Sequence, residues 1–339
     1  MPLLIGMYYS RDYLNFVNTI ERKKYGGYFM KKLNISWEGI HDSTGYLFSF
    51  AKSLACAVKN SPWPEYTEDI VATSGFAFRM WVSADLCPSA TSIWEFDNQK
   101  PWVESGGLTC DYVGRYWGQD NIEEEKRLEA IAKIKSSINN GIPAISWDTG
   151  LPEWGLITGY DEDGQMFSIL SIVEDDSPAS SQMPFAQLGK REIPLLSVLT
   201  ITGKSDKTEE NILYDTKKLA VSHLTGAEWS DENASGLEAY PALIRHFEED
   251  FNPDLSWNME YFLGTYGALK YYAWKYFEKM KETELATIYK AVFEAWQEAF
   301  EIKTSQDISQ LEVRVRISTL LKSAHENEIQ AVDIMSRSI

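Results

Sequence analysis

The chain has 339 residues, 44% of them hydrophobic and 24% charged, which is typical of a packed globular protein with room for two domains. Its formal net charge is −18 at pH 7, and an acidic surface repels phosphate backbones and anionic lipid headgroups. We therefore expect no nucleic-acid partner and no membrane partner.

The cysteines and histidines show no spacing typical of a bound metal. Three cysteines lack any Cys-x-x-Cys pair, and four histidines show no H-E-x-x-H pattern. We therefore expect no metal site and no cofactor. The first residues do not resemble a signal peptide, and no apolar run reaches the length of a membrane helix, which predicts a cytoplasmic protein with free thiols.

The first informative element is a helix predicted over Tyr46–Val58. Apolar residues at 47, 50/51, 54 and 58 follow helical spacing. Asp42, Ser43 or Thr44 is expected to cap this helix, because their side-chain oxygens can accept free backbone N–H groups. Residues 1–36 have ambiguous periodicity and predict either short strands or a strand and a helix, and Glu68–Arg79 predicts a second helix or a helix and a turn.

The middle of the chain predicts an antiparallel meander that follows a helix. The helix is expected over Ile122–Asn140, with an acidic first turn and an Asn-Asn-Gly stop. Strands are expected over 110–117, 141–147, 153–160, 165–173 and 193–202. The turns Asp148–Pro152 and Asp161–Gly164 join the three central strands, which predicts that they pair as neighbours.

Residues 203–210 are polar, charged and begin with glycine, so they predict a linker, with the domain boundary after residue 205. The chain beyond it is helical in pattern throughout. Helices are expected over 212–224, 236–247, 258–280, 284–302 and 308–335. Aromatic residues surround the third of these, which predicts burial on several sides, either against the N-terminal domain or in a homodimer through the C-terminal helices.

The segment GIPAISWDTGLPEWGLITGYDEDG at 141–164 resembles the second half of bacterial papain-like cysteine enzymes. The nearest patterns are those of the butirosin-biosynthesis acyltransferase group and of the peptidases that process double-glycine leader peptides. Ser74–Arg79, SGFAFR, is similar to a segment that follows the nucleophile helix in the acyltransferase group. The resemblance covers mainly residues 37–80 and 125–172. It implies an α+β papain-like domain over 1–205, followed by an all-α domain over 206–339.

The resemblance also implies a catalytic cysteine at the start of the first helix and a catalytic histidine at the start of the second meander strand. Asp42, or Ser43 if the alignment shifts by one, stands at the first position, and Glu153 stands at the second. A glutamate cannot form the thiolate–imidazolium pair that a thiol peptidase requires. Cys56 lies inside the predicted helix and is expected to be inert, so the sequence predicts a pseudoenzyme with respect to peptidase chemistry.

Three interpretations of Asp42 and Glu153 remain open. Asp42 could cap its helix and Glu153 bond a nearby backbone N–H or His41, within a retired active site. The two carboxylates could instead face each other across the old cleft, so that one is held as a general acid, which would support hydrolysis or binding of a cationic ligand such as an amine or aminoglycoside. A third version adds His41 and a divalent metal to the two carboxylates, although no further ligands stand at suitable spacing.

These interpretations give two hypotheses of function. In the first, the former active-site cleft binds a small molecule or peptide, with Ser43, Trp37, Trp147, Trp154 and Tyr116 as candidate walls. In the second, Asp42 and Glu153 act as acid and base in acyl transfer or amide hydrolysis. The acidity of the chain argues against an acyl carrier protein as a partner. Residues 174–176 are expected to form a solvated loop.

Overall fold

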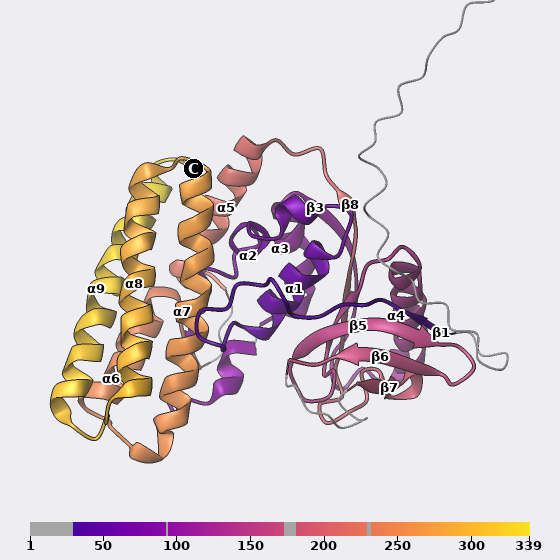
Figure 1. The fold of residues 1–339 in the computed structure, drawn as a ribbon, viewed down its shortest axis with the longest axis horizontal. Helices are drawn as coiled ribbons and strands as arrows, with labels where there is room; N and C mark the ends of the chain where they lie inside the picture. Colours follow the sequence, from indigo (N-terminus) through magenta and orange to yellow (C-terminus); the bar gives the residue numbers. More distant parts are fainter. Residues whose placement is uncertain (1–29, 93, 173–180, 229–231) are drawn as a thin grey trace, which may run out of the picture.

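The computed structural model describes residues 30–92, 94–172, 181–228 and 232–339, and it has the expected α+β architecture (Figure 1). A mixed layer of short helices lies between a sheet and a bundle of long C-terminal helices. The elements expected in residues 1–29 and the acidic loop at 174–176 fall outside the described residues. None of the helices in the described ranges combines the length and the apolar character needed to span a lipid bilayer.

The main sheet is antiparallel and has seven strands among the described residues. They are β1 (Met30–Lys32), β3 (Leu108–Arg115), β4 (Ala144–Trp147), β5 (Trp154–Asp161), β6 (Met166–Leu170), β7 (Gln182–Pro184) and β8 (Leu196–Lys204). Their order is β3-β8-β4-β5-β6-β7, and β1 pairs with the last three residues of β5. The predicted meander is confirmed, because β4, β5 and β6 pair consecutively and antiparallel.

Alternation along the strands divides the buried side chains between the two faces of the sheet. Ile145 and Leu156 belong to the core shared with α1 (Ser49–Lys59) and the C-terminal helices. Their neighbours Ala144 and Ile157 belong to a second core, which α4 (Glu123–Asn139) covers from the other side. The sheet is therefore buried on both faces, which explains the nearly unbroken apolar runs of β4 and β5.

The start of α1 corrects the predicted helix cap. The helix begins at Ser49, and its N-cap residue, Phe48, makes no side-chain capping bond. Gly45 has φ +82°, a left-handed conformation that a helix cannot contain. Asp42 stabilises the loop before the helix, since its Oδ1 accepts hydrogen bonds from Gly45 N at 2.9 Å and Leu47 N at 3.1 Å.

Short elements connect α1 to the sheet and to the C-terminal helices. The helices are α2 (Ile70–Thr73) and α3 (Gln99–Ser105), with the 3-10 turns η2 (Pro64–Tyr66), η3 (Pro88–Ser92), η4 (Phe96–Asn98), η5 (Asp120–Ile122), η7 (Phe185–Gln187), η8 (Gly236–Glu238) and η9 (Pro253–Leu255). Of the two predictions for Glu68–Arg79, the helix followed by a turn is confirmed, because α2 ends before Gly75, which has φ +82°. A second small sheet pairs β2 (Trp81–Val82) with β9 (Ala234–Ser235).

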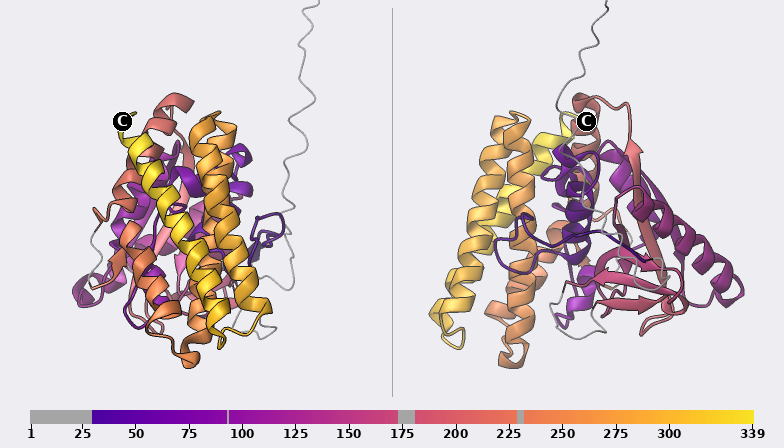
Figure 2. Two further views of the ribbon diagram at one scale, coloured as in Figure 1. Left: turned by 90° about the vertical axis from the view of Figure 1, so that its left-hand side faces the viewer. Right: turned by 45° about the vertical axis from the view of Figure 1, so that its right-hand side comes forward.

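The five predicted C-terminal helices are confirmed, with each end within three residues of its expected position. They are α5 (Glu209–Leu224), α6 (Ala239–Glu248), α7 (Ser256–Lys279), α8 (Thr283–Ser305) and α9 (Leu311–Ser336). Figure 2 shows α7, α8 and α9 side by side. Only Ser205–Thr208 separates β8 from α5.

The predicted burial of α7 against the N-terminal part is confirmed. Trp81 N donates to Tyr266 Oη at 2.7 Å, and Tyr272 Oη donates to the carbonyl oxygen of His41 at 2.7 Å. Thr44 Oγ1 donates to the carbonyl oxygen of Gly264 at 2.8 Å. One continuous apolar core includes residues from both α1 and α9, so the two parts of the chain pack as one body. A homodimer through the C-terminal helices remains a prediction.

Candidate functional site

A pocket of about 550 Å³ at one end of the main sheet is the main candidate site among the described residues. Four segments line it: Pro88, Ser89, Ser92 and Trp94–Phe96, then Tyr116 and Trp117 after β3, Trp147 with the turn 151–153, and Ile193 and Leu195 before β8. The antiparallel pairing of β3 with β8 and of β4 with β5 brings these strand ends together. The lining is mainly apolar and aromatic, as is typical of small-molecule sites.

An aromatic cluster forms the base of this pocket. Trp154 is fully buried, and its ring centroid lies 5.6 Å from that of Trp94, 5.0 Å from that of Phe96 and 5.2 Å from that of Trp147. Trp147 and Trp154 meet because they are direct partners in the register of β4 and β5. The cluster therefore fixes the lining residues Trp94, Phe96 and Trp147 against a rigid layer.

Glu153 lines the pocket immediately before β5 and bonds the start of α1. Ser49 Oγ donates to Glu153 Oε2 at 2.5 Å, and Trp154 N donates to Ser49 Oγ at 3.3 Å. Burial raises the pKa of the Glu153 carboxyl, while the hydrogen bonds from Ser49 and from Trp154 N act in the opposite direction. Glu153 is thus a half-buried carboxyl group whose neighbours here are neutral donors.

The rim of the pocket is built by the turn after β3 and the turn before β5. Trp117 is 64% exposed, and Tyr116 Oη accepts a hydrogen bond from Asp97 N at 3.4 Å. In the turn before β5, Asp148 has φ +55° and its backbone N–H donates to the carbonyl oxygen of Glu153 at 2.9 Å. These two turns bring the largely exposed Trp117 indole and the Glu153 carboxyl group to the pocket.

Several polar atoms of the lining have no hydrogen-bond partner among the described residues. They are Ser92 Oγ, Trp94 Nε1 and Trp147 Nε1, all on side chains that are at least nine-tenths buried. Buried polar groups are usually satisfied. The three atoms are therefore candidate hydrogen-bonding groups for a bound molecule.

Of the residues predicted from the sequence, Glu153, Trp147 and Tyr116 line the pocket, and Trp154 lies beneath it. The structure does not bring Asp42 into this group. Asp42 Oδ2 accepts a hydrogen bond from Lys52 Nζ at 3.2 Å, in addition to the two backbone bonds of its loop.

The other predicted residues lie apart from the pocket lining. His41 stacks on Tyr271 with ring centroids 3.6 Å apart, and burial lowers its pKa. Trp37 Nε1 donates to the carbonyl oxygen of Ser171 at 3.0 Å, and Ser43 Oγ is buried without a partner among the described residues. None of the three is among the residues that line the pocket.

Sequence reasoning missed Ser49, Trp94 and Phe96. Ser49 is a single polar residue within the apolar run Leu47–Ala51, and placing the helix start too early left it inside the helix. Trp94 and Phe96 stand in a segment without periodicity, so no pattern connects them to strands that follow fifty residues later. A signal did exist for Ser49, because a hydroxyl in such a run needs a partner when it is buried.

The described residues offer no thiol–imidazole pair. Burial raises the pKa of the Cys56 thiol and of the Cys110 thiol to about 12, and the predicted inertness of Cys56 agrees with its complete burial. Their sulfur atoms contact backbone carbonyls and Asn60. No group of three His, Cys, Asp or Glu side chains within the described ranges is arranged to hold a metal ion.

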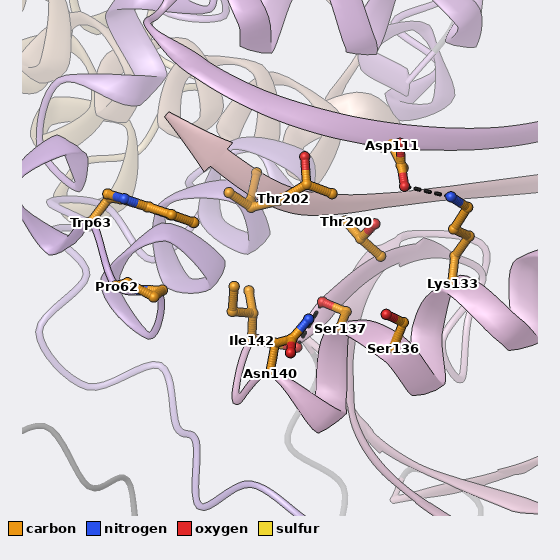
Figure 3. Close-up of a pocket in the computed structure, with 11 residues that line it drawn as sticks. Pro62, Trp63, Asp111, Lys133, Ser136, Ser137, Asn140, Ile142, Thr200 and Thr202 are labelled. Atoms are coloured by element: carbon orange, nitrogen blue, oxygen red, sulfur yellow. Dashed lines mark hydrogen bonds and ion pairs between the residues drawn. The ribbon is translucent and has the colours of Figure 1, made fainter. Parts of the chain in front are cut away.

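A second pocket of about 230 Å³ lies where the end of α4 approaches β3 and β8 (Figure 3). Its two charged lining residues form an ion pair, because Lys133 Nζ lies 2.6 Å from Asp111 Oδ2. Ser137 Oγ donates to the carbonyl oxygen of Ile142 at 2.9 Å. It is smaller than the pocket lined by Trp94, Trp147 and Tyr116, which we call the aromatic pocket, and its charged side chains are already paired.

Two buried clusters of charged residues lie at the junction between the N-terminal part and the C-terminal helices. In the Arg79 cluster, Arg79 Nε lies 3.1 Å from Glu228 Oε1, and His223 Nδ1 lies 3.1 Å from Glu228 Oε2. Burial would raise the pKa of Glu228, but Arg79 and His223 hold it below its usual value, whereas burial lowers the pKa of His223.

In the Lys270 cluster, Lys270 Nζ lies 2.8 Å from Glu328 Oε1, and both side chains are at most 1% exposed. Tyr240 Oη donates to Glu328 Oε2 at 2.8 Å and accepts a hydrogen bond from Trp296 Nε1 at 2.9 Å. In both clusters the charged groups bond one another, which is typical of a structural role.

Comparison with known proteins does not assign the chain to a class. Neither a scan against protein-family models nor a search of curated proteins found a match.

Proposed function

We propose that this protein binds a small molecule, or a side chain of a peptide, in the aromatic pocket, and that it has a papain-like arrangement without the Cys-His pair of a peptidase. The observation that carries this function is the pocket of about 550 Å³ lined by Trp147, Tyr116 and Glu153. Its unpartnered polar atoms on Ser92, Trp94 and Trp147 support it, because a bound ligand could satisfy such groups.

The position of α1 supports the papain-like part of the proposal. Ser49, the first residue of α1, bonds Glu153, which immediately precedes β5. The resemblance in sequence implies that the nucleophile begins the helix and that the histidine begins the strand. Ser49 and Glu153 therefore occupy the two ends of the contact that the resemblance implies, with neither residue able to supply thiol–imidazole chemistry.

The binding function is tested by ligand-induced thermal stabilisation over a library of small organic molecules and short peptides. A ligand at one hundred times its Kd stabilises the folded state by about 2.7 kcal/mol. Ser89→Trp provides the matched control, because Ser89 is an exposed lining residue and an indole there fills the pocket from its rim. Stabilisation of the wild type that Ser89→Trp abolishes supports the function, and stabilisation that persists in this variant contradicts it.

Acyl transfer or amide hydrolysis is the second candidate, and the hydrogen bond between Ser49 and Glu153 is the observation that favours it. Ser49 Oγ would attack the acyl carbonyl as Glu153 takes its proton, and Glu153 would then return that proton to the leaving group. Water or an acceptor amine would release the acyl group from Ser49. Ser49 is only 4% exposed and is not a lining residue, so binding is the better supported function.

The second candidate is tested with an activated ester such as para-nitrophenyl acetate. Acetylated Ser49 found by mass spectrometry, together with loss of turnover in Ser49→Ala, supports it. Turnover that Ser49→Ala leaves unchanged excludes it.

A further inference from the structure

The ionisable residues that line the aromatic pocket carry one sign of charge. Glu95 and Glu153 are acidic, and the described lining residues include no Lys, Arg or His. Arg191 lies near the rim, but its Nε is 3.4 Å from Asp148 Oδ1 and its NH2 donates to the carbonyl oxygen of Gly150 at 3.2 Å. The field inside the pocket therefore favours a positive charge.

Glu153 differs from the other buried glutamates in its partners. Glu228 and Glu328 each bond a buried cation, whereas the hydrogen bonds to Glu153 come from the Ser49 hydroxyl and the Trp154 backbone. A carboxylate has about four lone-pair sites, so these neutral donors leave acceptor capacity. A half-buried carboxylate without a cation becomes more stable when one arrives.

Aromatic faces at the same pocket add a second attraction for a cation. Trp117 is 64% exposed, and both Trp117 and Tyr116 line the pocket. The face of an aromatic ring carries negative potential and attracts ammonium groups. Trp94 attracts a cation less strongly, because Trp154 stacks on its ring and the Arg79 guanidinium lies 4.9 Å from it.

We propose that the pocket binds an organic monocation, an ammonium group carried on an apolar or aromatic body, with its charge at Glu153 and its body against Tyr116 and Trp117. The proposal rests on the proposed binding function and names its ligand class. A monocation fits better than a polyamine, because Glu95 is exposed to water and only Glu153 offers a shielded carboxylate.

The test compares two ligands that differ only in charge, by isothermal titration calorimetry on the full chain. They are meta-hydroxyphenyltrimethylammonium and its neutral isostere meta-tert-butylphenol, with spermidine as a polycation. The variants are Glu153→Gln, which keeps the shape of the side chain, and Glu124→Gln, which removes the same charge from an exposed position on α4. Trp117→Ala and Ser89→Trp probe the rim.

We expect the ammonium ligand to bind at one site, at least about tenfold more tightly than the phenol. Glu153→Gln should remove most of this preference, whereas Glu124→Gln should keep it. Trp117→Ala should lower the affinity for the ammonium ligand about two- to fivefold. Since Trp117 is exposed, this variant gives a result even if Glu153→Gln does not fold.

Equal affinity for the ammonium ligand and the phenol would overturn the proposal, and so would tighter binding of spermidine than of the ammonium ligand. The proposal would also fail if Glu124→Gln lost as much of the preference for the ammonium ligand as Glu153→Gln. Binding of the phenol that Ser89→Trp abolishes would then show that the binding function stands and that only the ligand class is wrong. If neither aromatic ligand binds and the library yields no stabilising compound, the proposed function itself fails.

Discussion

The aromatic pocket and the junction between the two parts of the chain both contain buried acidic groups, but they satisfy them differently. At the junction, Glu228 bonds Arg79 and Glu328 bonds Lys270. In the pocket, Glu153 bonds neutral donors. Removing one partner of a buried pair is strongly destabilising. The junction charges therefore stabilise the folded state, whereas the pocket carboxylate is available to a ligand.

Two tyrosines at the junction contrast with two tryptophans of the pocket. At the junction, Tyr266 Oη and Tyr240 Oη each take part in two hydrogen bonds. In the pocket, the indole N–H groups of Trp94 and Trp147 have no partner among the described residues. If the two regions differ in this way, changes at the junction should mainly alter stability, and changes at the pocket should mainly alter binding.

The largest effect is expected for Glu328→Ala, which leaves the Lys270 ammonium buried without its anion. We expect the free energy of unfolding to fall by about 3–5 kcal/mol. Urea denaturation measures this loss. Replacing both residues, as in Lys270→Met with Glu328→Leu, removes the buried charges together and should cost less. A loss below about 1 kcal/mol for Glu328→Ala would show that the Lys270 cluster does not stabilise the fold.

Asp42→Ala should lower the free energy of unfolding by about 1–2 kcal/mol, because two backbone N–H groups and Lys52 lose their acceptor. Asp42→Asn should lose less, since its amide oxygen can still accept the backbone bonds. Chemical denaturation of both variants gives the two values. Ligand affinity should be unchanged in both variants. A folded Asp42→Asn protein that no longer binds ligand would place Asp42 in the functional site.

The Arg79 cluster predicts a pH dependence through His223. Its pKa is lowered in the folded state, so the unfolded chain takes up the proton first and stability is lost as the pH falls below 6.5. Between pH 7.5 and 5.5, the wild type should lose about 1 kcal/mol more than His223→Gln. This difference isolates His223 from His41, His246 and His325, whose pKa values are also lowered. Equal losses in the two proteins would show that His223 is not held neutral.

Glu153→Gln should raise the free energy of unfolding at pH 7, whereas the junction variants should lower it. Because the pKa of Glu153 is raised in the folded state, its contribution to stability falls as the pH rises from about 4.5 through the raised value. The variant should be more stable than the wild type by a few tenths to about 1 kcal/mol at pH 7, and no more stable at pH 4. Urea denaturation at both values measures this. A loss above about 1 kcal/mol at pH 7 would place Glu153 with the structural charges.

The smallest effect on stability is expected for Trp117→Ala. The side chain is 64% exposed, so the free energy of unfolding should change by less than about 0.5 kcal/mol. Thermal denaturation measures the change. The same variant should weaken ligand binding, so that its effects on stability and on binding separate. A large destabilisation would show that Trp117 supports the fold of the rim.

The helices and the meander could be predicted because their signals are local. Helical spacing in the five C-terminal segments, and turn residues between apolar runs at 141–173, follow from neighbouring positions. The start of α1 was predicted wrongly, since Asp42 looks like a helix cap but instead stabilises a loop whose Gly45 has a positive φ. Local composition does not distinguish the two roles, because both use the same carboxylate and backbone N–H groups.

The candidate site could be predicted only in part. Glu153, Trp147 and Tyr116 were named from the sequence because they stand at strand ends or at a position marked by the resemblance. The residues that complete the pocket, such as Trp94 and Leu195, reach it from other segments. Their arrangement depends on the strand order, in which β8 inserts between β3 and β4.

The α+β class, the meander, the C-terminal helices and the absence of an imidazole at position 153 can all be read from the amino-acid sequence, because each is encoded within a short stretch of chain. The contact of Ser49 rather than Asp42 with Glu153, and the aromatic pocket without a basic side chain in its described lining, are visible only in the folded chain. Partners a hundred residues apart are selected by packing and register, and no local periodicity records that choice.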